Sequence, residues 1–130
     1  MNFYVSVTHA LFWYLINSPL LGANARLAFD EADAGQALIY IPAIVIAELY
    51  YLNEKKGRPL DFRTKYARLA QSKQFVLLPF YPSHTLDFDA CSAMTEMHDR
   101  MIAADARRTK ATLLTRDVQI ASSGVVATVW

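Results

Sequence analysis

Short apolar strands alternate with helical segments along this chain, and that alternation limits the possible fold more than any other feature. Strands are expected over residues 3–7, 38–41, 75–79, 112–115 and 125–130, because each is a short apolar run next to turn or capping residues. Helices fill the intervals between them. This order is typical of a parallel sheet with helices on both faces. We therefore predict one α/β domain over residues 1–130, a three-layer sandwich with a mostly parallel five-stranded sheet.

Polar residues before apolar runs indicate where the helices begin. Thr8 is the expected N-cap of the first helix, and Ser18, followed by Pro19, that of the second. A helix from His98 or Asp99 is expected to end by Thr109. Another, capped by Ser83, would present an apolar stripe made of Leu86, Ala90, Ala93, Met94 and Met97.

Composition narrows the classes of protein that this chain can belong to. Hydrophobic residues make up 54% and charged residues 19%, which indicates a folded domain. The net charge of +1 excludes a strong overall field that would steer nucleic acid, so any such contact depends on local basic patches. Cys91 is the only cysteine, which favours the cytoplasm. The apolar stretch over residues 38–47 is too short for a membrane span, which needs about 20 residues.

Glu48 is an acid in an apolar setting. In a helix its neighbours three and four positions away would be Ile44, Val45, Tyr51 and Leu52. A buried carboxylate costs several kcal/mol unless a metal, a cation or a proton compensates it. Glu48 is therefore either a metal ligand or the partner of a distant lysine or arginine.

Asp99 and Asp117 also stand beside apolar runs, close to where expected strands and helices meet. In an open parallel sheet, ligands bind beyond the carboxyl ends of the strands, so these two acids and Glu48 are expected to converge there. Three carboxylates suit Mg²⁺ or Mn²⁺. The alternatives are an N-cap role for Asp99 and a turn role for Asp117.

Basic residues near these acids would offset their repulsion of a phosphate backbone. Candidates close by in the sequence are Arg100, Arg107, Arg108, Lys110 and Arg116. The alternative for the 107–110 patch is a solvated helix end. Asp105 precedes Arg108 by three residues, which favours a structural surface ion pair. His9 and His98 lack partners at zinc-ligand spacing.

Four sequence pieces together resemble the PIN domain of the VapC toxin type. They are residues 7–13, Ala47-Glu48, the segment 98–106 that begins His98-Asp99-Arg100, and residues 113–117. The resemblance implies a metal-dependent single-strand ribonuclease, held inactive by an antitoxin protein and often a homodimer. It also implies the strand order 3-2-1-4-5, metal ligation by Glu48, Asp99 and Asp117, and support from Thr115. Thr8 and Arg100 are further candidates for supporting roles.

Val7 departs from that pattern, because the family has an aspartate at this position. A valine offers no oxygen to a metal, and even indirect losses at metal sites cost roughly 10- to 100-fold in affinity or activity. Two explanations fit. Either the domain is naturally degenerate and keeps only RNA or antitoxin binding, or the natural protein has aspartate and this chain carries a substitution at Val7 that silences a toxic enzyme.

Overall fold

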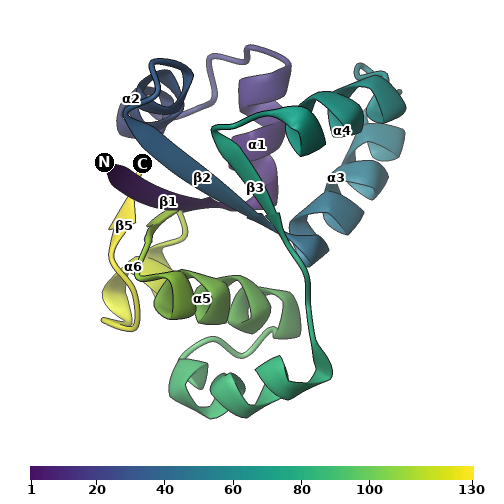
Figure 1. The fold of residues 1–130 in the computed structure, drawn as a ribbon. Coiled ribbons are helices and arrows are strands. Elements are labelled where there is room, and N and C mark those ends of the chain that lie inside the picture. Colours follow the sequence, from purple (N-terminus) through teal and green to yellow (C-terminus); the bar gives the residue numbers. More distant parts are fainter.

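The computed structural model describes all 130 residues and contains one five-stranded parallel sheet. Its strands are β1 (Asn2–Ser6), β2 (Ala37–Pro42), β3 (Phe75–Leu78), β4 (Thr112–Leu114) and β5 (Thr128–Val129). They are arranged in the order β3-β2-β1-β4-β5, and every neighbouring pair is parallel (Figure 1). The α/β class and the strand order expected from the family resemblance are confirmed.

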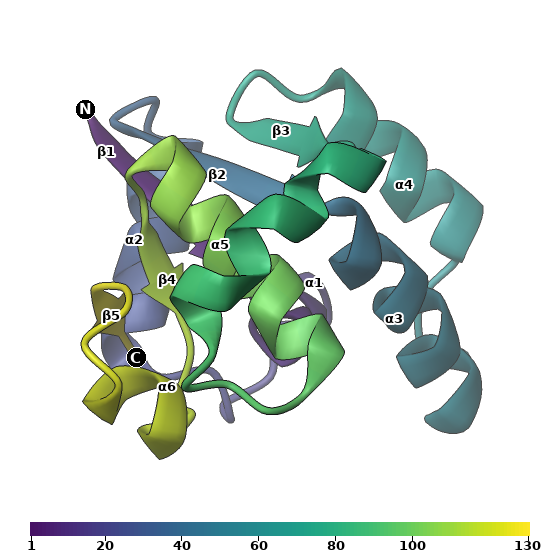
Figure 2. The ribbon, with the colours of Figure 1, turned by 90° about the horizontal axis from the view of Figure 1, so that it is seen from below.

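Six α-helices and one 3-10 helix connect the strands. They are α1 (Thr8–Leu15), α2 (Ala23–Asp33), α3 (Ala43–Lys55), α4 (Phe62–Gln71), η1 (Pro82–Cys91), α5 (Met97–Thr109) and α6 (Val118–Ser122). Helix α5 and η1 lie together on one face of the sheet, and α1 and α2 lie on the other (Figures 1 and 2). Helix α4 packs beside β3, at one edge. No helix has the length and apolar character needed to pass through a lipid bilayer.

The central strands are buried on both faces, as a sheet between two helical layers requires. Val5 of β1, Ile39 and Ile41 of β2, and Leu113 and Leu114 of β4 are completely inaccessible to solvent. These near-continuous apolar runs form the centre of the core, and they hold the carboxyl ends of the three strands side by side. The loops that follow those ends therefore have a rigid support.

The predicted starts of the first two helices are wrong. Val7, in an extended conformation, is the N-cap of α1, and no side chain caps that helix. Thr8 is instead its first residue, and its hydroxyl is directed elsewhere. Helix α2 begins at Ala23, after Gly22, because the Ser18 hydroxyl accepts a hydrogen bond from the Leu20 amide and closes a short turn.

The predicted apolar stripe after Ser83 is also wrong. This segment is the 3-10 helix η1, whose period of 3.0 residues per turn does not align residues spaced for an α-helix. Leu86 is 83% exposed and Met97 is 56% exposed, whereas Met94 is buried. The segment packs along α5 at the side of the domain, so the sheet does not bury its outer residues.

Two further element boundaries differ from the prediction. The N-cap of α5 is Glu96, whose carboxylate accepts a hydrogen bond from the Asp99 amide, so Asp99 lies inside the first turn. The last strand is only Thr128–Val129, and the short helix α6, which we did not predict, precedes it. Asp99 therefore lies in the first turn of α5 and Asp117 at the start of α6. Both helix starts lie at the carboxyl ends of the strands.

Candidate active site

A cavity of about 1050 Å³ opens at the carboxyl ends of β1, β2 and β4. Its walls come from the start of α1, the middle of α3, the start of α5 and the segment after β4. The chain runs through β1, β2 and β3 in one direction and then returns to the other side of β1 for β4. The cavity therefore lies at the switch point of the sheet, where open α/β folds bind their ligands.

Glu48 reaches this cavity from α3 and is held there by two hydrogen bonds. The Thr8 hydroxyl donates to its Oε1 at 2.7 Å, and Nδ1 of His98 lies 3.2 Å from its Oε2. Its side chain is 32% exposed, and its neighbour Tyr51 is 73% exposed. The face of α3 around Glu48 is thus half-buried, less than the apolar pattern indicated, and no lysine or arginine pairs with this carboxylate.

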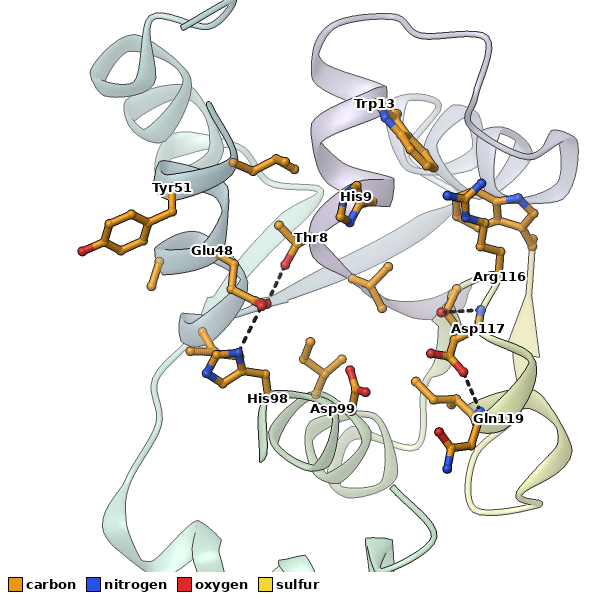
Figure 3. A pocket seen from close by; sticks show the side chains of 18 of the residues that line it. Thr8, His9, Trp13, Glu48, Tyr51, His98, Asp99, Arg116, Asp117 and Gln119 are labelled. Atoms are coloured by element: carbon orange, nitrogen blue, oxygen red, sulfur yellow. Dashed lines mark hydrogen bonds and ion pairs between the residues drawn. The ribbon is translucent and has the colours of Figure 1, made fainter. Parts of the chain in front are cut away.

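Asp99 projects into the cavity from the first turn of α5 (Figure 3). Burial is the main cause that raises the pKa of its carboxyl, and the negative charges of Glu96, Asp117 and Glu48 raise it further. The charge of His98 lowers this pKa, by less than each of these effects raises it. The N-cap role that we considered for Asp99 belongs to Glu96, so the carboxyl group of Asp99 has no structural partner.

Asp117 lies on the opposite wall, at the N-terminus of α6. Its Oδ1 accepts a hydrogen bond from the Ile120 amide at 3.0 Å, and its own amide donates to the Thr115 hydroxyl at 3.1 Å. Asp117 is therefore a helix cap as well as a cavity residue, which replaces the turn role that we weighed. Thr115 is buried and lines the same cavity, so it fixes the backbone that carries Asp117.

The structure thus brings Glu48, Asp99 and Asp117 to one cavity, with the carboxyl groups of Asp99 and Asp117 on facing walls (Figure 3). Their oxygens are the donors that magnesium and manganese prefer. In this arrangement, however, no group of three or more acidic, histidine or cysteine side chains is close enough to hold a metal ion. Val7 also lines the cavity and adds no oxygen. The donor set suits a hard cation in kind, but it is incomplete.

Most of the predicted basic rim points elsewhere. Arg100 donates to the carbonyl oxygens of Met94 and Ser92 and does not line the cavity. Arg107 donates to the Val125 carbonyl, and Arg108 pairs with two carboxylates. Only Arg116 of these candidates lines the cavity.

Asp105 is the ion-pair partner of Arg108, as predicted, but its carboxylate is buried and only Arg108 reaches the surface. The Asp105 side chain is only 7% exposed, and Arg108 connects it to Asp87 of η1. Burial raises the pKa of the Asp105 carboxyl, and the Arg108 guanidinium opposes that rise. This acid belongs to the contact between α5 and η1 and is not part of the cavity.

Aromatic and cationic side chains form a further wall, of which the sequence alone indicated only Arg116. The Arg116 guanidinium carbon lies 4.8 Å from the centre of the Trp13 ring. The rings of His9 and Trp130 approach the same indole, at 5.3 Å and 5.8 Å between centres. Burial, followed by the charge of Arg116, lowers the pKa of His9. Trp13 fits a helical core stripe, so nothing in its spacing identified it as a cavity residue.

Comparison with known proteins agrees with this geometry. The family model described as PIN domain matches residues 4–124. Similar solved structures include VapBC2 from Rickettsia felis bound to a DNA fragment from their promoter, with a TM-score of 0.71, 19% identity and 98% of both chains covered. A toxin–antitoxin complex from Klebsiella pneumoniae follows, with a TM-score of 0.66, 19% identity and 96% of both chains covered. FitAcB from Neisseria gonorrhoeae has a TM-score of 0.62 and 22% identity, over 96% of this chain and 95% of that one. No curated protein sequence matches.

Proposed function

We propose that this chain, which belongs to the PIN domain family, is a single-strand endoribonuclease of the toxin–antitoxin type whose metal site is impaired at Val7. The observation that carries the proposal is the meeting of Glu48, Asp99 and Asp117 in one cavity at the switch point of the sheet. A cluster of carboxylates with no pairing lysine or arginine is electrostatically unfavourable, and a divalent cation would compensate it.

Glu48, Asp99 and Asp117 would hold Mg²⁺ or Mn²⁺, and the ion would supply Lewis acidity that activates water and offsets the negative charge of a phosphodiester. The other residues of the cavity position these ligands. Thr8 and His98 fix the two oxygens of Glu48, and the Thr115 hydroxyl fixes the backbone of Asp117. Arg116 supplies the positive charge on the cavity wall that an RNA backbone requires.

An antitoxin is the protein partner that we infer for this chain. Two of the similar structures are VapBC2 bound to DNA and a toxin–antitoxin complex. Each aligns with nearly the whole of this chain. We also infer a homodimer that acts in the cytoplasm, as the family resemblance implies. An antitoxin would keep an active ribonuclease silent until it is needed.

A second function, RNA or antitoxin binding without catalysis, is favoured by Val7. This residue occupies the N-cap of α1, where its backbone is extended and its side chain lines the cavity. An aspartate there would add an oxygen ligand and also cap the helix. With valine, the cavity lacks a group of three metal-binding side chains within reach of one ion.

The test is to restore a carboxylate at position 7 and measure manganese-dependent cleavage of single-stranded RNA and the growth of the expressing host. Val7→Asp is compared with the unchanged chain and with Val7→Asn. The asparagine variant is a matched control, because asparagine caps a helix as well as aspartate does but is uncharged. A gain of activity and toxicity with aspartate alone supports the ribonuclease.

Other results separate the two functions. Equal activity in the aspartate and asparagine variants would show that capping of α1, and not a metal ligand, was missing. Absence of cleavage in all three proteins, together with retained RNA binding, would favour the binding domain and overturn the proposal. Circular dichroism on each variant confirms that the comparison is made between folded proteins.

A further inference from the structure

Beside Asp117, the cavity has a wall that binding a metal ion does not explain. It consists of Trp13, His9, Arg116 and Trp130 (the aromatic wall), which come from α1, from the segment between β4 and α6, and from the residue after β5. Figure 3 shows His9, Trp13 and Arg116 on the side of the cavity away from Asp99. Carboxylates that hold a metal ion need no indole rings for phosphate chemistry, so this wall indicates a second kind of contact.

The indole rings of this wall are fixed in place. Trp13 is only 7% exposed and belongs to the hydrophobic core. Trp130 packs directly over Gly22, where an added Cβ atom would come within 2.6 Å of its ring. A glycine at that position therefore permits the close approach of the second indole. The two rings meet edge to face at 5.8 Å, so the wall exists before any ligand binds.

Arg116 lies on this rigid support with its charge unpaired. It takes part in none of the five ion pairs of the structure, although Asp117 is next to it in the chain. Its guanidinium carbon is 4.8 Å from the centre of the Trp13 ring, a distance typical of a cation–π contact. A guanidinium held against an indole on one side offers its other side to a second flat, electron-rich group. Arg116 and His9 are both exposed, so that side is accessible.

We propose that the aromatic wall is a nucleobase subsite, in which an unpaired base of the substrate stacks on the guanidinium of Arg116 beside His9. This inference rests on the proposed ribonuclease function and extends it, because it states what lies next to the cleaved phosphate. Unpaired bases commonly stack on aromatic rings and on arginine planes. The order Arg116-Asp117 places the stacked base next to the carboxylates, so the wall would set which linkage of a single strand enters the acidic side.

The protein has two tryptophans, and both line this cavity, so intrinsic fluorescence reports on the subsite directly. The unchanged chain is titrated with a short single-stranded RNA in the presence of EDTA, which removes any metal and prevents cleavage. An abasic oligomer with the same number of phosphates serves as the matched ligand. The RNA is expected to quench the fluorescence and to bind more tightly than the abasic oligomer.

Two substitutions at Arg116 separate stacking from charge. Arg116→Lys keeps the charge and loses the plane, and Arg116→Ala loses both. Loss of one stacked base should weaken RNA binding about 5- to 150-fold in either variant. Arg63→Ala is the control, because Arg63 is an exposed arginine of α4 that does not line the cavity; its binding should equal that of the unchanged chain.

Three outcomes would overturn the subsite. Equal binding of RNA and the abasic oligomer would show a phosphate contact only. Full binding by Arg116→Lys would show that charge alone matters. Failure of RNA to bind the unchanged chain at all would remove the subsite as well. If RNA and the abasic oligomer bind equally, or if Arg116→Lys binds fully, while Val7→Asp cleaves RNA, the subsite is wrong and the proposed function stands. If Val7→Asp does not cleave RNA but base stacking is observed, the proposed function is wrong and the subsite stands.

Discussion

Helix α5 carries two acids with the same tendency and opposite surroundings, Asp99 in its first turn (the open end) and Asp105 in its C-terminal half (the paired end). Burial raises the pKa of both Asp99 and Asp105. At Asp105 the Arg108 guanidinium counteracts that rise. At Asp99 the charged groups with the largest effects on the pKa are other carboxylates, which raise it further. Asp105 is therefore paired with a cation inside the protein, whereas Asp99 faces a cavity and has no paired cation.

This contrast separates a structural acid from a functional one better than burial does. Asp105 is the more buried of the two, yet its pairing with Arg108 and the link from Arg108 to Asp87 account for it fully as a contact between α5 and η1. Asp99 accepts no hydrogen bond from the protein and faces Asp117 across the cavity. An unfavourable charge without an internal partner indicates an external one.

The largest effect should come from the open end of the helix. In the Val7→Asp background, we expect Asp99→Asn to lower manganese-dependent RNA cleavage at least about 100-fold, because it removes a direct ligand where even indirect losses cost up to that much. The variant should keep the same fold. Asp89→Asn, at an exposed acid of η1, is the control and should cleave normally. Full cleavage by Asp99→Asn would show that the open charge has no catalytic role.

Substitution of Asp105, at the paired end of α5, should change the stability of the protein. We expect Asp105→Ala to lower the free energy of unfolding by about 2 kcal/mol, measured by urea denaturation. This is less than for a fully buried pair, because Arg108 is 32% exposed and keeps Asp87 as a partner.

A double variant tests whether the loss in stability is due to an unpaired charge. Replacing both partners, as Asp105→Leu with Arg108→Met, should recover most of the stability, since apolar side chains of similar size often replace a buried pair without loss. If the double variant is as unstable as Asp105→Ala, then the link from Arg108 to η1, and not the pairing of charges, is what stabilises this end of the helix.

The sequence predicted the frame of the molecule and the acids of the site for different reasons. Strands such as 38–41 are short, continuous apolar runs with Gly35 before them and Pro42 after them, so their length and their flanking residues identify them. Glu48 was visible because a carboxylate interrupts an apolar run. Its partners Thr8 and His98 were not predicted, because they come from two other elements and meet it only in the folded chain.

The remaining errors have local physical causes. Ser83 and Leu86 have the spacing of an α-helix, but the segment forms a 3-10 helix at the side of the domain, where the sheet does not cover it. Asp105 has the spacing of a surface pair, and only the packing of η1 on α5 buries it. The spacing of Trp13 predicts a core residue, and Trp13 does lie in the core; the subsite role that we propose for it depends on Arg116, which lies far away in the sequence.

A divalent ion should stabilise the open end of α5 and leave the paired end unchanged. For Val7→Asp we expect manganese at ten times its dissociation constant to raise the free energy of unfolding by about 1.4 kcal/mol. The original chain should gain less, because it has one ligand fewer, and addition of EDTA should reverse both gains. The Asp105→Ala variant in the same background should keep the full increment. An equal gain in the presence and absence of Asp99 would place the ion elsewhere.

The smallest effect is the dependence of stability on pH, measured without metal. Because the pKa of Asp99 is raised in the folded protein, its contribution to stability is complete below the ordinary value of 3.8 and is lost as the pH rises through the raised value. Asp99→Asn removes this loss. The variant should therefore gain stability relative to the original chain as the pH rises from below 3.8 to neutrality, by less than about 1 kcal/mol, since Asp99 is partly exposed and solvent screens it.

Urea denaturation at several pH values, at low and high salt, measures the difference. High salt should reduce the gain, because Glu96, Asp117 and Glu48 contribute to it through repulsion. A difference of the opposite sign would mean that a cation, absent from the structure, already pairs with Asp99, and the contrast between the two ends of α5 would disappear.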